Sequence, residues 1–85
     1  MSQVLKKILE LYPVNEFTTA VGFNDAVIGV DLDSGRLIYS VNKCVDILVY
    51  ADGMDMDEAI DHFEDNIRTA YEQYETGPIW ANTDF

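Results

Sequence analysis

Few residues in this 85-residue chain are of types that catalyse reactions or bind metals. Cys44 is the single cysteine and His62 the single histidine, and they fall in two different predicted helices. A zinc site takes its ligands from paired Cys or His residues, and a nucleophile needs a base within reach, so we expect neither kind of site. Cys44 lies among Val41, Val45 and Leu48, which is typical of a small buried hydrophobic residue.

Two groups of aspartates carry the oxygen ligands that Ca²⁺ prefers. An EF-hand loop beginning at Asp31 would need glycine at its sixth position and glutamate at its twelfth, where this chain has Arg36 and Asn42. The second group has the wrong spacing and is better explained as helix capping; it consists of Asp52, Asp55 and Asp57. We therefore expect no metal, no cofactor, no catalytic residue and no enzymatic activity.

Acidic residues are concentrated in the segment 46–75, which has ten of them against one base, Arg68, for a net charge of −9. Seven would lie on or near one side of the predicted helix 57–74, namely Asp57, Glu58, Asp61, Glu64, Asp65, Glu72 and Glu75. Neighbours three or four residues apart on a helix lie about 5–6 Å from each other. This acidic face predicts either a binding surface for a basic protein or an imitation of the phosphates of DNA. The ordinary alternative is a solvated helix face.

The composition limits the classes of partner. With 16 acidic and 5 basic residues the chain has a net charge of −11 and a pI near 4.1. Nucleic acids and anionic membranes attract clusters of Lys and Arg, so we expect no direct contact with either. The mostly apolar stretch 41–51 is too short to span a bilayer, which needs about 20 residues. One cysteine and the lack of a signal peptide favour the cytoplasm.

The elements that must position these residues can be read from periodicity and turn signals. The chain predicts a helix at 3–12, a hairpin of strands 26–32 and 36–39 around the turn 33–35, a helix at 41–50 capped by Ser40, a helix at 57–74 capped by Asp55, and a short strand at 79–81. Residues 14–24 fit either a short strand or a loop. Together they predict one α+β domain, 1–85, with a small antiparallel sheet of the hairpin and the C-terminal strand against about three helices.

Two helices have extensive apolar faces. The long helix is expected to turn Ile60, Phe63, Ile67, Ala70, Tyr71 and Tyr74 toward the core. The helix 41–50 is apolar over most of its circumference, which predicts burial on two sides, by its own domain or by a partner. A homodimer formed through this helix would account for that pattern.

Four segments match the motifs of a known family. They are AVIGVD (26–31), GRLIYS (35–40), the segment 52–63 with DGM (52–54), DEAI (57–60) and Phe63, and GPIW (77–80). With these motifs the chain, over roughly residues 24–81, resembles a family of short acidic bacteriophage proteins. The resemblance assigns no chemistry to any residue. It implies a viral accessory protein in a bacterial cytoplasm that binds and modulates a host protein; a DNA-mimic inhibitor and a virion component are the alternatives.

Overall fold

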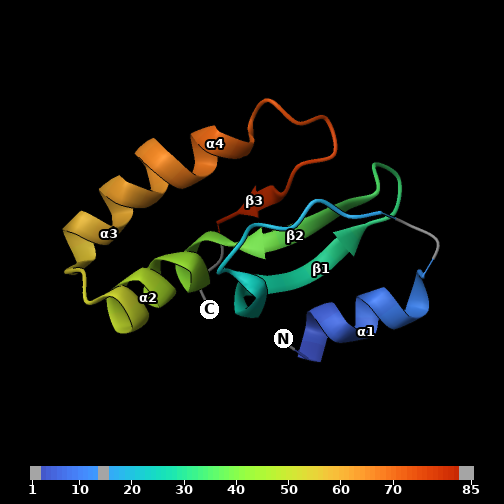
Figure 1. Cartoon of the computed structure of the whole chain (residues 1–85), viewed down its shortest axis with the longest axis horizontal. Helices are drawn as coiled ribbons and strands as arrows, with labels where there is room; N and C mark the ends of the chain where they lie inside the picture. The colour runs from blue at the N-terminus through green and yellow to red at the C-terminus, as the bar shows by residue number, and fades with distance from the viewer. Residues whose placement is uncertain (1–2, 14–15, 83–85) are drawn as a thin grey trace.

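The computed structural model describes residues 3–13 and 16–82, and in this part of the chain it confirms the predicted α+β class. Three strands form one sheet in the order β1-β2-β3, and three helical units surround it (Figure 1). The helix α1 (Gln3–Leu11) lies beside β1 (Val27–Asp31), and α2 (Val41–Asp52) directly follows β2 (Arg36–Ser40). The described part of 14–24 has no strand; it is loop and turn up to the short 3-10 helix η1 (Asn24–Ala26).

The predicted hairpin is confirmed. β1 and β2 pair antiparallel, with Val27 opposite Tyr39 and Asp31 opposite Arg36. The register shifts between Val27 and Gly29, so the glycine marks a β-bulge. The turn is closed where Asp31 Oδ1 accepts a hydrogen bond from the backbone N–H of Asp33 at 3.1 Å. The carboxylate of Asp31 therefore stabilises the turn.

The sheet is mixed rather than wholly antiparallel, which corrects the sequence prediction for the C-terminal strand. β3 (Ile79–Ala81) pairs parallel to β2, with Tyr39 opposite Trp80. The reason is the connection: α2 and the helices after it carry the chain back before β3 begins, so β3 runs in the same direction as β2. Arg36 holds the entry to β3, because its Nε donates to the Gly77 carbonyl at 2.7 Å and its Nη2 to that of Pro78 at 3.2 Å.

The caps predicted around α2 and the next helix are confirmed. Ser40 Oγ accepts from the N–H of Lys43 at 3.2 Å, and Asp55 Oδ1 from that of Glu58 at 2.8 Å. Gly53 ends α2 in the left-handed region, at φ 73°. These capping groups place α2 and its successor at a sharp angle at one end of the molecule (Figure 1).

The helical run from Met56 to Tyr71 is not one regular α-helix. It consists of α3 (Met56–His62), the π-helical η2 (Phe63–Arg68) and α4 (Thr69–Tyr71). In π geometry each N–H pairs with the carbonyl five residues earlier, so a turn holds an additional residue. In an α-helix every fourth residue advances about 40° beyond a full turn, and the wider π turn removes much of that drift. The side turned to the core therefore follows every fourth residue: Ala59, Phe63, Ile67 and Tyr71.

The predicted core face of this run was wrong at Ile60, Ala70 and Tyr74, which are exposed. The sequence prediction assumed α-helical spacing throughout, and the π segment rotates Ala70 and Tyr74 away from it. Ile60 lies before that segment, and it is exposed because the neighbouring Ala59 faces the core in its place. The run also ends at Tyr71, three residues before the predicted end. Two turns follow the run. The first is closed by the Tyr74 N–H, which donates to the Tyr71 carbonyl oxygen at 3.2 Å, and the second by the Gly77 N–H, which donates to that of Tyr74 at 3.1 Å.

The core joins all three helical units to the sheet. It includes Leu5 and Ile8 of α1, Leu37 and Tyr39 of β2, and Phe63 of η2, each buried. The Trp80 ring lies 5.3 Å from the Tyr39 ring, 5.2 Å from Phe63 and 6.2 Å from Tyr71, centroid to centroid. Trp80 is therefore a large, partly buried contributor to the core.

Gly77 offers a test of this packing. A Cβ at this position would lie 2.8 Å from the Tyr71 carbonyl oxygen and 3.2 Å from that of Tyr74. Because backbone atoms cannot move aside cheaply, we expect Gly77→Ala to lower the free energy of unfolding by about 1–3 kcal/mol in urea denaturation. Gly29→Ala is the control, since its Cβ would find its nearest neighbour 3.9 Å away. Equal stability of the two variants would contradict the close approach at Gly77.

Candidate functional site

The seven residues of the predicted acidic face are all exposed. Asp57 and Glu58 lie in the first turn of α3, where negative charge stabilises a helix N-terminus. Asp61 follows in α3, and Glu64 and Asp65 lie in η2. Glu72 and Glu75 come after the end of α4 at Tyr71. The acidic face therefore extends from the start of α3 into the turns beyond α4, and the π segment changes the angular spacing of its residues from that of an α-helix.

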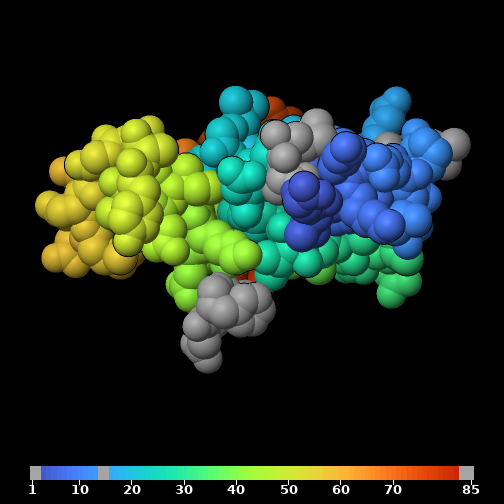
Figure 2. All heavy atoms as spheres, turned by 90° about the horizontal axis from the view of Figure 1, so that it is seen from below, coloured from blue at the N-terminus to red at the C-terminus, as the bar shows by residue number. Residues whose placement is uncertain are grey.

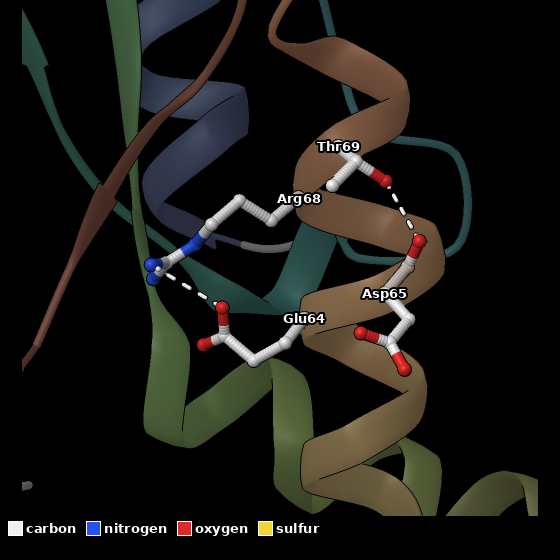
Figure 3. A network of polar contacts seen from close by, with 4 residues as sticks. All are labelled: Glu64, Asp65, Arg68 and Thr69. Atoms are coloured by element: carbon white, nitrogen blue, oxygen red, sulfur yellow. Dashed lines mark hydrogen bonds and ion pairs between the residues drawn. The ribbon is translucent and has the colours of Figure 1, made fainter.

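Glu64 and Asp65 point to different sides of the helix (Figure 3). Glu64 Oε2 lies 3.4 Å from Arg68 Nη1, and the guanidinium carbon of Arg68 lies 5.6 Å from the centroid of the Phe63 ring. An exposed pair four residues apart contributes only about 0.3–0.5 kcal/mol to stability. Beside Asp65, the Thr69 hydroxyl donates to the Asp65 backbone carbonyl at 2.7 Å, so the Asp65 carboxylate takes no part in that bond. Arg68 thus offsets only one of the carboxylates locally.

A groove with a volume of about 500 Å³ lies between α2 and the α3–η2 run; we call it the α2–α3 groove. Its apolar lining is supplied by Val41 and Val45 of α2, Met56 and Ile60 of α3, and Phe63 of η2. Two carboxylates, Asp46 and Glu64, also line it. The groove therefore borders the acidic face through Glu64. Sequence reasoning missed it, because Ile60 had been assigned to the core; the pairs Val41/Val45 and Met56/Ile60, each four residues apart, were the available signal.

Cys44 and His62 are not brought together into a reactive pair. Cys44 is fully buried on α2, and burial raises the pKa of its thiol to about 12. At neutral pH the thiol is therefore protonated, which suits the predicted hydrophobic role rather than that of a nucleophile. His62 Nδ1 lies 3.3 Å from Asn66 Nδ2 on the next turn of the helical run.

Burial also raises the pKa of Tyr39, although the hydrogen bond that its hydroxyl accepts from the Ala20 N–H, at 2.9 Å, acts in the opposite direction. This bond ties the loop before η1 to the middle of the sheet. In the described residues, no group of three or more His, Cys, Asp or Glu side chains is placed to hold a metal ion. None of the described helices is both long and apolar enough to cross a bilayer.

The helix α2 packs more completely within the chain than its sequence suggested. Val41, Cys44, Val45 and Leu48 are buried, and Ile47 and Val49 pack partly against the core. Of the apolar residues that motivated a homodimer through 41–50, Tyr50 alone is largely exposed, at 84%. Most of the apolar surface of α2 is therefore covered within the chain by η1, β2 and α3, which it contacts.

Comparison with known proteins gives no match: no family model, no curated protein and no solved structure matches the chain. The resemblance to short acidic bacteriophage proteins stays a prediction from the motifs.

The buried thiol generates a prediction for alkaline pH. The folded pKa of Cys44, about 12, exceeds the ordinary value of 9.0, so the folded state retains a proton that the unfolded state loses above pH 9. The free energy of unfolding should therefore fall as pH rises from 9 to 12, by up to about 1 kcal/mol per pH unit from this group. Tyr39, whose pKa is also raised, adds to the loss above pH 10.

The measurement is urea unfolding of the wild type and Cys44→Ala between pH 7 and pH 11. The variant should be less stable at pH 7, because a buried sulfur is lost, and should show a shallower decline above pH 9. Parallel pH profiles for the two proteins would show that Cys44 is not the group responsible.

Proposed function

We propose that this protein acts by binding another protein through its acidic face, as a small non-catalytic accessory protein of bacteriophage type that modulates a host protein in the bacterial cytoplasm. The observation that carries the proposal is the charge arrangement: the seven carboxylates are exposed, while the whole segment 46–75 contains one base, Arg68. A surface of one sign attracts a basic partner and accelerates the encounter. The bacteriophage and host context rests on the sequence motifs alone.

The test removes charge where it serves no evident structural purpose. Asp61→Asn, Asp65→Asn and Glu72→Gln together neutralise three exposed positions and leave the capping Asp55 and the ion-paired Glu64 untouched. Glu10→Gln, Glu16→Gln and Asp25→Asn make the same change in net charge at exposed positions elsewhere. Each tagged protein is used to capture partners from bacterial lysate at low and at high salt, with identification by mass spectrometry.

We expect the wild type and the control variant to retain the same protein at low salt, and the acidic-face variant to lose it. High salt should release it, because exposed charges are screened within about 3 Å at 1 M. A protein that all three forms retain equally, even at high salt, would contradict binding through the acidic face.

The DNA-mimic alternative is a narrower form of this proposal. It is favoured by the continuous series of carboxylates from Asp57 to Asp65 along the helical run. Its specific requirement is competition: duplex DNA must displace the captured partner from the acidic face. If the captured protein has no affinity for DNA, the DNA-mimic alternative is excluded and the proposal of an accessory protein that binds a basic partner is retained. If the chain instead self-associates into large particles, the virion component becomes the better description.

A further inference from the structure

The α2–α3 groove combines a buried floor with accessible walls. Val41, Val45 and Phe63 are nearly or fully buried, at 8%, 7% and 0% exposure. Met56 and Ile60 are exposed at 51% and 43%, although both line the groove. An apolar side chain seated between these walls would lose contact with water and gain contacts on several sides. Met56 is also unbranched and adaptable, which suits a wall that adjusts to its occupant.

The charged residues that line the groove are all of one sign. Asp46 comes from α2 and Glu64 from η2, where it pairs with Arg68, and among the described residues the lining includes no Lys or Arg. Asp57 and Asp61, which are exposed, are carried by the same helix as Met56 and Ile60. The apolar groove is therefore set in acidic surroundings, whose complement is an apolar ridge flanked by basic side chains.

We propose that the α2–α3 groove binds the apolar face of an amphipathic helix that carries Lys or Arg on its flanks and belongs to the partner protein. This inference rests on the proposed function and names the part of that interface which anchors the partner. The groove lies between two helices, the arrangement in which a third helix inserts side chains at i, i+3, i+4 and i+7. Its volume of about 500 Å³ is within the range, about 300–1,000 Å³, of sites that enclose whole small molecules, so it accommodates more than one such side chain.

The acidic face and the α2–α3 groove contribute differently to binding. Exposed carboxylates steer a basic partner over distances of about a Debye length and contribute little to the lifetime of the complex. Apolar anchors buried at the centre of an interface carry most of its affinity. The acidic face alone would hold any cation weakly, whereas the groove selects a helix with a matching apolar face.

The experiment uses two synthetic peptides with the same number of lysines. In the first, Leu residues repeat at i, i+3, i+4 and i+7 among the lysines; in the second, each Leu is replaced by Gln. Their dissociation constants are measured by isothermal titration calorimetry against the wild type, Ile60→Ser and Val4→Ser. Val4 is the matched control, because it is a β-branched helical residue exposed at 41%, on α1, away from the end formed by α2 and α3 (Figures 1 and 2).

We expect the Leu peptide to bind the wild type more tightly than the Gln peptide. Ile60→Ser should weaken the Leu peptide about 5- to 30-fold, the factor typical of one interface anchor, and should leave the Gln peptide unchanged. Val4→Ser should change neither by more than about 2-fold. Met56→Gln serves as a second groove variant, and circular dichroism of each variant verifies its fold.

Three outcomes would overturn the proposal or its basis. If the two peptides bind with equal affinity, and Ile60→Ser has the same dissociation constants as Val4→Ser, the groove is not the binding site and the proposed binding by the acidic face is unaffected. Peptide binding that survives Asp61→Asn, Asp65→Asn and Glu72→Gln unchanged would instead remove the proposed function while retaining an apolar site. A dimer in sedimentation equilibrium that Ile60→Ser dissociates would assign the groove to a second copy of the chain.

Discussion

The contact of Trp80 with Tyr39, Phe63 and Tyr71 joins parts of the chain that are distant in sequence. Trp80 reaches this position because β3 pairs parallel to β2, and that pairing requires the chain to return through α2 and the following helical run. The hydrogen bonds from Arg36 to the carbonyls of Gly77 and Pro78 fix the start of the same strand. The position of the acidic helical run against the sheet therefore depends on a strand of three residues.

The π segment sets how the later part of this run faces the core. Together with α3 before it, this segment turns Ala59, Phe63, Ile67 and Tyr71 toward the core. Ile60, which precedes the π segment, lies at the surface with Met56. The carboxylates of the run are exposed, so each remains hydrated and none bears the cost of burying a charge. One side of the helical run thus packs in the core while its other sides carry the surface charge. An apolar groove next to a negatively charged surface is the result.

Local features were predictable because their causes are local. The hairpin follows from β-rich residues around a turn, with Gly35 at φ 69°, and the helix caps follow from Ser40, Asp55 and Gly53. The direction of β3 was not predictable from the same kind of reasoning, since three residues carry no signal for parallel or antiparallel pairing. The groove was missed for a related reason: Ile60 fits an α-helical apolar stripe with Phe63 and Ile67, whereas in the structure Ala59 faces the core and Ile60 is exposed.

By itself, the sequence determined the α+β class, the order of the elements, the caps and the exposed carboxylates of 57–75, because spacing, turn residues and hydration act over a few residues. The tertiary structure alone decided four features: the mixed sheet, the π segment, the burial of most of the apolar surface of α2 within its own chain, and the α2–α3 groove. Each of these arises where side chains from separate elements compete for the same core volume. That competition is settled by packing in three dimensions, which no local pattern records.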